Sequence, residues 1–391
     1  MCMKTLGVAV LGYGFMGKTH TYAHHTMPFY YDPMPVQCRL RVVCSSTPQR
    51  GAAAQKAGGF ERLTTSFEEA IRADDVDVVH VCTPNHLHLP ALRLAIAAGK
   101  HIYVEKPLTA TVQEAEQVEQ LLPAYRGTGQ IVLHNRFFPA TMKAKQLVTE
   151  GFLGPVTHFR AAYLHAGSVD PDAPVNWKST AAAGGGVVRD LGSHVIDLVN
   201  WLIGPLTAVN CVSRIWSPQR PDRQRPGQKI TIDAEEAAVM LLRLADGGIG
   251  TLEASKIATG VEDELRLEIH GRHGAMRFNL MEPDFLEIYD GRLSDGPLGG
   301  RHGWQRIASV HRYPPPGGTF PGPKATVGWL RGHVHCLYNF LESIAQGRPA
   351  EPSLAAGVHL QRVMESVLES ARTGRWIDLP TPAKRPGPAP E

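Results

Sequence analysis

A glycine-rich turn near the N-terminus limits most strongly how this chain can fold. The run TLGVAVLG at residues 5–12 predicts a buried strand, and Gly12, Gly14 and Gly17 follow in G-x-G-x-x-G spacing before a helical stretch. This order is typical of a βαβ unit that binds a dinucleotide pyrophosphate at the helix N-terminus. We expect Gly12 to permit the tight turn, Gly14 to let the pyrophosphate approach, and Gly17 to let helix and strand pack closely.

Strands and helices alternate after this turn. The pattern predicts strands at 39–44, 76–81, 101–104 and 130–133 and helices at 67–73, 88–98 and 111–122. Short connections between alternating strands and helices indicate a doubly wound parallel sheet. The sequence therefore predicts a dinucleotide-binding domain over residues 1–135.

Beyond this region, longer strand-like runs are joined by turns. We expect helices at 139–150, 184–204, 329–346 and 354–372, a long Gly- and Pro-rich loop at 290–327, and strands at 156–164, 206–216, 235–244, 248–257, 265–270, 275–279 and 285–289. These elements indicate an α+β domain with a large open, mostly antiparallel sheet at 136–379. The Pro-rich residues 380–391 are expected to form a disordered tail.

Composition excludes several classes of protein. The net charge of +3, without a block of Lys and Arg, argues against a nucleic-acid partner. No run reaches the roughly 18 to 20 apolar residues of a membrane span. The six cysteines form no C-x-x-C pair and fit buried free thiols in a reducing compartment. We therefore expect a cytoplasmic enzyme with no membrane partner and no bound metal.

The end of the second strand leaves the choice between NAD and NADP open. An acidic residue there usually binds the ribose 2′-hydroxyl of NAD. This chain has Ser45, Ser46 and Arg50 instead. An arginine and hydroxyls suit the 2′-phosphate of NADP, while serines also suit NAD.

Other residues expected at the cofactor follow the carboxyl ends of strands, which meet at one edge of such a sheet. They are Phe15, Met16, Thr83, Pro84, Asn85, His88, Glu105 and Lys106.

The run GGGVVRDLGSHVIDLVNWLIG at 184–204 predicts an apolar helix with a polar stripe. Asp190, His194 and Asp197 are spaced to share one helix face. A buried polar stripe is costly unless it is paired or used. Lys106, held by Pro107 at the end of a strand, is a second candidate for chemistry.

The motifs GYGFMG, CTPNHLH, VEKPL and GGGVVRDLGSHVIDL, in this order, resemble the Gfo/Idh/MocA oxidoreductase family, as does FLESIAQGRPAEPSLAAG near the end. The resemblance implies an N-terminal Rossmann domain and a C-terminal α/β domain whose open sheet packs against another subunit. A homodimer or homotetramer is therefore expected. It also implies that Lys106, Asp190 and His194 surround the reacting carbinol of a sugar or polyol.

These three residues suit hydride transfer from a secondary alcohol. His194 is the best candidate base, since an unperturbed imidazole titrates near neutrality. Lys106 would stabilise the developing alkoxide. Asp190 would bind a neighbouring hydroxyl or orient Lys106 or His194. Asp197 either satisfies a buried contact or touches substrate.

Aromatic and polar clusters predict where a sugar binds, because aromatic faces stack on pyranose rings. We expect substrate contacts from Arg136, His165, Trp177, Lys178, Asp190, His194 and Trp329. With these clusters, HTYAHHTMPFYYDPMP at 20–35 resembles the subgroup of glycoside 3-dehydrogenases that includes levoglucosan-oxidising members. That likeness implies oxidation of a pyranose hydroxyl at C3.

The same residues suit a second reaction. Some family members are NAD-dependent glycoside hydrolases that use transient C3 oxidation, elimination, hydration and re-reduction, some of them on sulfoquinovosides. For an anionic sugar of that kind, Lys178, Arg136, Arg331 and His333 are candidate ligands. A cofactor-sensing regulator without activity would lack the Lys, Asp and His set that this chain has.

Overall fold

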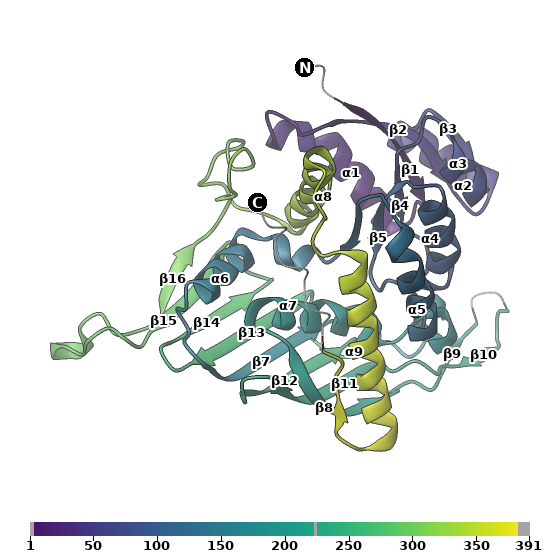
Figure 1. Ribbon diagram of the computed structural model, residues 1–391. Helices are drawn as coiled ribbons and strands as arrows, with labels where there is room; N and C mark the ends of the chain where they lie inside the picture. The colour runs from purple at the N-terminus through teal and green to yellow at the C-terminus, as the bar shows by residue number, and fades with distance from the viewer. Residues whose placement is uncertain (1–3, 223–224, 382–391) are drawn as a thin grey trace.

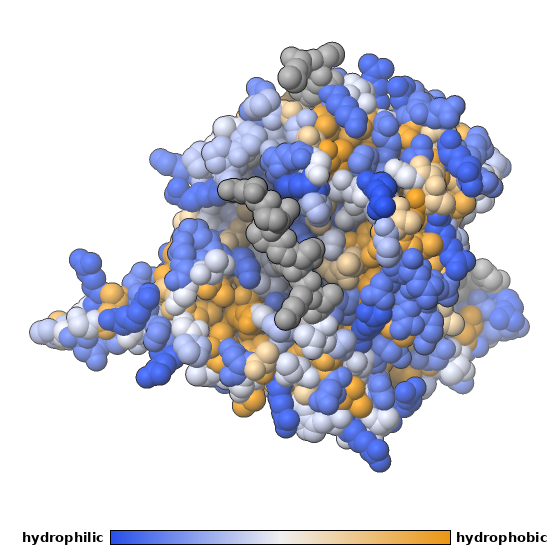
Figure 2. Space-filling model, viewed as in Figure 1, coloured by the Kyte–Doolittle hydropathy of each residue, from blue (hydrophilic) through white to orange (hydrophobic). Residues whose placement is uncertain are grey.

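Two sheets organise the chain in the computed structural model, which describes residues 4–222 and 225–381 (Figure 1). Most of the predicted tail lies outside the described residues. Hydrophilic side chains cover most of the face in Figure 2, with apolar patches between them. Among the described helices, none combines the length and apolar character that crossing a bilayer requires.

The first sheet has six parallel strands in the order β3-β2-β1-β4-β5-β6. This is the doubly wound order, and it confirms the predicted parallel sheet. The strands are β1 (Thr5–Leu11), β2 (Gln37–Cys44), β3 (Arg62–Thr64), β4 (Val78–Val81), β5 (His101–Glu105) and β6 (Gly129–Val132). The helices between them are α1 (Phe15–Tyr30), α2 (Pro48–Gly58), α3 (Phe67–Arg72), α4 (His88–Ala97) and α5 (Val112–Leu121).

Local sequence explains why these elements form. The β4 run VVHV is buried throughout, as expected for a parallel strand covered on both faces. Helix α2 begins after Thr47, whose side chain accepts a hydrogen bond from the Arg50 amide, and Pro48 occupies its first position. It ends at Gly59, which adopts a left-handed conformation with φ of 71°.

The second sheet has nine strands in the order β16-β15-β14-β13-β7-β12-β11-β8-β17. All neighbours are antiparallel except β7 and β12, so the predicted open, mostly antiparallel sheet is confirmed. The strands are β7 (Val156–Leu164), β8 (Leu206–Arg214), β11 (Ala237–Leu244), β12 (Ile249–Ser255), β13 (Glu264–Gly271), β14 (Gly274–Asn279), β15 (Phe285–Asp290), β16 (Gln305–Ala308) and β17 (Ile377–Asp378). A separate two-stranded sheet joins β9 (Gln219–Pro221) and β10 (Lys229–Thr231).

One expectation for this region was wrong. Residues 290–327 are not a continuous loop, because Gln305–Ala308 pairs with β15 as the edge strand β16. The four residues QRIA are mostly exposed, so they carry no burial pattern that distinguishes them from a loop.

The described helices that pack on the nine-stranded sheet lie on one of its faces (Figure 1). They are α6 (Pro139–Thr149), α7 (Ser193–Ile203) and α9 (Leu354–Thr373), and contacts join them to β14 and β15, to β7, and to β8 respectively. Along β11, buried and exposed residues alternate, which leaves Val239 and Leu241 about half exposed on the other face.

The last two helices return to the first sheet. Helix α8 (Trp329–Gln346) packs beside α1, and α9 also lies along α5 (Figure 1). Buried residues of α8, such as Leu337 and Phe340, share one core cluster with Leu6 and Val8 of β1. The division at residue 135 stays a prediction.

Candidate active site

A cavity of about 1740 Å³ joins the carboxyl edge of the first sheet to the second sheet and its helices. Most of the residues predicted for the site line it. On the cofactor side these are Gly12, Gly14, Phe15, Met16, Ser45, Ser46, Arg50, Thr83, Pro84, Asn85, Glu105 and Lys106. On the substrate side they are His165, Trp177, Lys178, Asp190, His194 and Trp329.

The glycine turn leaves the N-terminus of α1 open to the cavity. Gly12 has φ of +87°, and a Cβ there would lie 2.8 Å from the carbonyl oxygen of Cys82. A Cβ on Gly17 would lie 2.1 Å from the carbonyl oxygen of Gly12, so Gly17 serves close packing and does not line the cavity. A Cβ on Gly14 would meet nothing within 4 Å. The first turn of α1 has no side-chain cap and no acidic residue, which fits a dinucleotide pyrophosphate.

The end of β2 presents hydroxyls and one cation to the cavity. Ser45, Ser46 and Arg50 all line it, and Arg50 Nη1 donates to Ser46 Oγ at 3.3 Å.

Two of the residues predicted for the cofactor connect parts of the site. Asn85 Nδ2 donates to the carbonyl oxygen of Gly184 at 2.8 Å, which joins the first sheet to the segment before α7. His88 does not line the cavity. Its buried ring nitrogens lie 3.0 Å from the carbonyl oxygens of Thr83 and Pro107. His88 was expected to contact the cofactor, but its ring instead links the loops after β4 and β5.

Three lysines surround the carboxylate of Asp190. Lys106 Nζ donates to Oδ1 at 3.0 Å and to the backbone carbonyl of Asp190 at 2.5 Å. The Nζ atoms of Lys178 and Lys256 lie 3.0 Å and 2.9 Å from Oδ2. Only Lys178 is substantially exposed, at 45% of its side chain, against 14% for Lys106 and 12% for Lys256. Sequence reasoning missed Lys256, whose signal was a lysine directly after a strand.

These charges set the ionisation of the cluster. Burial alone would raise the pKa of Asp190, but Lys256, Lys106 and Lys178 hold that pKa well below 3.8. Burial lowers the pKa of Lys106 below 10.5, and the carboxylate of Asp190 opposes this lowering. Asp190 is therefore a carboxylate, and Lys106 gives up its proton more readily than a solvated lysine does.

A π-helical turn, Val188–Gly192, places Asp190 in this cluster. We expected one helix over 184–204, whereas the regular α-helix α7 begins only at Ser193. π-helical turns occur frequently at functional sites. Here the turn brings both the backbone carbonyl and the carboxylate of Asp190 to Lys106.

His194 is a buried neutral imidazole. Burial, followed by the charge of Lys106, lowers the pKa of His194 well below 6.5. Its Nδ1 has no hydrogen-bond partner among the described residues. The ring of His134 lies 5.1 Å from that of His194 and stacks on that of His333 at 3.8 Å between centroids. All three rings line the cavity, and so does Trp329, 4.2 Å from His333. Sequence reasoning missed His134.

A second polar group lies on the substrate side. Tyr163 Oη donates to Asp263 Oδ1 at 2.8 Å, and His165 Nε2 lies 2.7 Å from the same oxygen. All three residues line the cavity. Tyr163 begins the aromatic and polar stretch that the sequence pointed to, whereas sequence reasoning missed Asp263, which the pairing of β7 with β13 brings to it.

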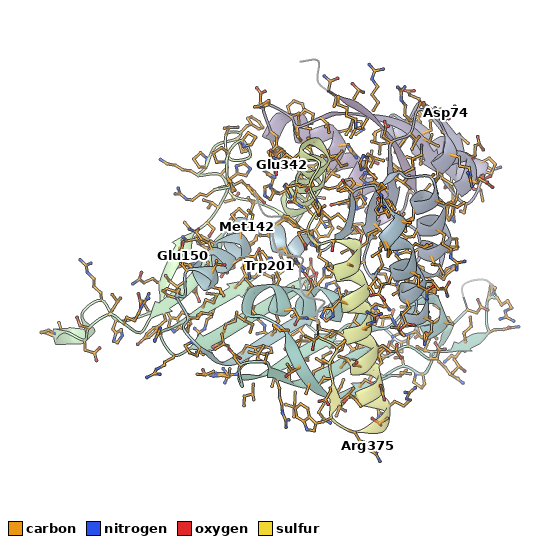
Figure 3. The ribbon with its side chains drawn as sticks, in the orientation of Figure 1. Asp74, Met142, Glu150, Trp201, Glu342 and Arg375 are labelled. Carbon is orange, nitrogen blue, oxygen red and sulfur yellow. The ribbon has the colours of Figure 1, made fainter. Side chains whose placement is uncertain are left out.

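The structure corrects the expectation for Arg136. Arg136 Nε donates to Asp197 Oδ2 at 2.7 Å, and both side chains are largely buried. The guanidinium also lies 5.5 Å from the ring centre of Trp201, which Figure 3 labels. Neither Arg136 nor Asp197 lines the cavity, and each satisfies the charge of the other.

Arg331 also lies outside the cavity. Its Nη1 donates to Tyr31 Oη at 2.7 Å, and its Nη2 donates to the carbonyl oxygen of Gly317 at 2.9 Å. Of the four residues expected to hold an anionic sugar, only Lys178 and His333 line the cavity. Among residues 4–222 and 225–381, no group of three His, Cys, Asp or Glu side chains is placed to hold a metal ion.

Family models match both halves of the chain. Residues 6–131 match the model of the oxidoreductase family with an NAD-binding Rossmann fold, and residues 141–277 match the GFO/IDH/MocA C-terminal domain. The chain belongs to the Gfo/Idh/MocA oxidoreductase family. Membership makes it an oxidoreductase with NAD as its cofactor.

Individual members of the family align over nearly the whole chain. A levoglucosan dehydrogenase of Pseudarthrobacter phenanthrenivorans is 32% identical over 391 residues, which cover 97% of this chain and 99% of the relative. A solved levoglucosan dehydrogenase in complex with NADH superimposes with a TM-score of 0.91 at 31% identity, covering 97% of this chain and 100% of that one. An inositol 2-dehydrogenase of Rhizobium meliloti is 26% identical over 73% of this chain and 79% of its own length.

Proposed function

We propose that this protein is an NAD-dependent dehydrogenase that oxidises a secondary hydroxyl, at C3, of a pyranose sugar or glycoside. One observation carries the proposal. The Asp190 carboxylate, held by Lys106, Lys178 and Lys256, lies with the neutral His194 in the cavity that the glycine turn opens. Such a site supplies a base and a stabilising cation for an alcohol, and it lies next to the cofactor.

The relatives support a sugar or polyol substrate. The protein aligned over 97% of this chain is a levoglucosan dehydrogenase, and levoglucosan is an anhydro-pyranose. A more distant relative is an inositol dehydrogenase, and inositol is a cyclic polyol. Both substrates present secondary hydroxyls on a six-membered ring, which favours the same reacting group here.

Each residue then has a role in proton transfer. Bound NAD would supply the hydride acceptor for the carbinol carbon. His194 takes the hydroxyl proton, because a neutral imidazole has a nitrogen lone pair free. The Lys106 ammonium stabilises the alkoxide as it forms. Asp190 positions Lys106 through two oxygens, so a single conformation of the lysine faces the substrate.

Other residues that line the cavity can bind the remaining hydroxyls and the ring of the sugar. Asp263 accepts hydrogen bonds and is held by Tyr163 and His165, so it can receive a sugar hydroxyl without reorganising. Trp177 and Trp329 offer aromatic faces to the ring. Lys178, the most exposed of the three lysines, is free to turn from Asp190 to a hydroxyl.

The end of β2 supports use of NADP as well as NAD. Arg50 and two serines line the cavity there, and no acidic residue follows β2 to repel a 2′-phosphate. We infer that NADP also binds, by contact of Arg50 with the phosphate.

The assembly that we propose is a homodimer or homotetramer formed through the nine-stranded sheet. Its support is the face opposite α6, α7 and α9, which no helix within residues 4–222 and 225–381 covers and where Val212, Val239, Leu241 and Ile249 are 72%, 52%, 49% and 61% exposed. Apolar patches of this kind mark interaction surfaces. Residues 1–135 would bind cofactor and 136–379 would supply substrate contacts and the interface. A cytoplasmic location stays a prediction.

One assay tests the proposed reaction. The purified protein is incubated with levoglucosan, aryl glucosides and aryl sulfoquinovosides in the presence of NAD or NADP, and reduced nicotinamide and released aglycone are followed together. We expect reduced nicotinamide without aglycone, and a 3-keto sugar as product. Aglycone without net reduction would overturn the dehydrogenase in favour of an NAD-dependent glycosidase. No reaction with any sugar of the panel would contradict the proposed substrate class.

A further inference from the structure

A row of histidines runs from the cavity along the face of α1 that carries His20 and His24. Glu105 Oε1 lies 2.9 Å from His20 Nε2. His20 Nδ1 lies 3.0 Å from His80 Nδ1, and His80 Nε2 lies 3.1 Å from His24 Nε2. Both ring nitrogens of His20 and of His80 therefore take part in this row of short contacts, and His20 Nδ1 also lies 3.1 Å from Cys82 Sγ.

The two ends of this row differ in surroundings. Glu105 ends β5, lines the cavity and directly precedes Lys106. Its negative charge also acts on Lys106, where it opposes the lowering of the pKa. At the other end, His24 is partly exposed, and its Nε2 faces His80. His20 and His80 between them are 2% and 0% exposed.

Two rings of the row, those of His80 and His24, are neutral. Burial, with the charges of neighbouring histidines, lowers the pKa of His80 well below 6.5 and that of His24 to about 3. A neutral imidazole carries one N–H and one bare nitrogen, so it can accept a proton on one side and release one from the other. Buried polar rings are costly unless they are paired, and here the partner of one imidazole is another imidazole.

We propose that Glu105, His20, His80 and His24 form a relay that carries the proton released by alcohol oxidation from the cavity to solvent. The inference rests on the proposed function, because that oxidation yields a ketone, reduced cofactor and one proton. Glu105 receives the proton inside the cavity, and this proton comes from His194, which took it from the substrate hydroxyl. Both side chains line the cavity.

The relay moves one proton and no electrons. Protonated Glu105 donates to Nε2 of His20, whose Nδ1 proton passes to Nδ1 of His80. The Nε2 proton of His80 passes to Nε2 of His24, and the Nδ1 proton of His24 leaves to water. Each N–H that breaks is replaced by one that forms on the same ring, so every imidazole stays neutral. Ring rotation, or a proton travelling inward during ketone reduction, restores the starting tautomers.

The experiment compares proton release with cofactor reduction in His24→Phe and His80→Phe. Both signals are followed in one rapid-mixing experiment, with a pH indicator in weak buffer. His25→Phe is the matched control, because His25 is the next residue of α1 and its Nε2 lies 2.8 Å from the Gly58 carbonyl oxygen, outside the row. We expect proton release to lag cofactor reduction by about tenfold or more in His24→Phe, and added imidazole buffer to remove the lag. The wild type and His25→Phe should show no lag.

Coincident signals in His24→Phe and His80→Phe, with no effect of imidazole, would overturn the relay while leaving the dehydrogenase in place. If no sugar reduces the cofactor in the wild type, the proposed function fails, and a measurement without substrate still decides the relay. Nitrogen-15 spectra of the histidine rings should show a neutral His80, and the tautomer populations of His20 and His80 should change together in His24→Phe and not in His25→Phe. Tautomers that stay unchanged in His24→Phe would overturn the relay without any assay of activity.

Discussion

The two walls of the cavity are built in different ways. On the cofactor wall, Gly12 and Gly14 keep side chains away, and backbone amides at the start of α1 face the cavity. On the substrate wall, side-chain charge dominates, with the lysines around Asp190 and the imidazole of His194 beside them. Backbone recognition depends on conformation and space, whereas the charged cluster depends on side-chain identity. Cofactor binding and turnover should therefore respond to different substitutions.

Lys106→Ala and His194→Ala are expected to give the largest difference between the effect on turnover and the effect on cofactor binding. Each should lower turnover by roughly 100-fold or more, because the stabilising cation or the base is lost. NAD affinity, measured by titration of protein fluorescence, should stay near the wild-type value. Lys143→Ala on α6 is the control, since Lys143 Nζ donates to Gln146 Oε1 at an exposed site. Unchanged turnover in both variants would remove the proposed mechanism.

Gly14→Ala should instead weaken NAD binding, which the two previous substitutions leave near the wild-type value. An added methyl would meet no protein atom within 4 Å, so the melting temperature should not change. The methyl would occupy the space where a phosphate approaches the amides, and loss of a hydrogen bond to a charged group raises Kd by about tenfold or more. Gly17→Ala is the comparison, because its Cβ would lie 2.1 Å from the Gly12 carbonyl oxygen and should lower the melting temperature. Unaltered NAD affinity in Gly14→Ala would show that the cofactor does not approach this turn.

The pH profile of kcat/KM reports on the substrate wall alone. Because burial and Lys106 lower the pKa of His194, the base stays unprotonated to lower pH than a free histidine does. A histidine with an ordinary pKa would be only about one-tenth active at about pH 5.5. We expect activity there close to its maximum, and an acidic limb at pH 6.5 or above would contradict this. On the alkaline side, the lowered pKa of Lys106 should bring the loss of activity below pH 10.5.

Arg50→Ala should give the smallest change and should affect only the cofactor wall. Arg50 is exposed, so its contact with a 2′-phosphate is screened by solvent and contributes up to about 1 kcal/mol. The Kd of NADP should rise by up to about fivefold, while that of NAD stays the same. Equal changes for both cofactors would place Arg50 away from the 2′ position.

The difference between the walls also explains what could be predicted from sequence. The glycine turn and the buried strands of the first sheet are local patterns, so β1 and the start of α1 followed from neighbouring residues. Strand β16 could not be found in this way, since its four residues are mostly exposed and form a strand only by pairing with β15.

On the substrate wall, sequence identified residue types without their partners. Asp190 and Lys106 were expected together, but Lys256 joins them only because β12 pairs beside β7. Arg136 was expected at the substrate and instead forms an ion pair with Asp197, 61 residues away in the chain. A charged residue can serve a ligand or another side chain, and only tertiary structure decides between the two.

The π-helical turn at Val188–Gly192 has a consequence for how this site tolerates insertions and deletions. Such a turn holds one residue more than an α-helical turn, and each residue of an α-helix advances by about 100°. Removing one residue there would restore a regular helix and rotate Asp190 away from Lys106, with no charged residue deleted. The register of the chain at this turn is therefore as specific a requirement for the lysine cluster as the carboxylate itself.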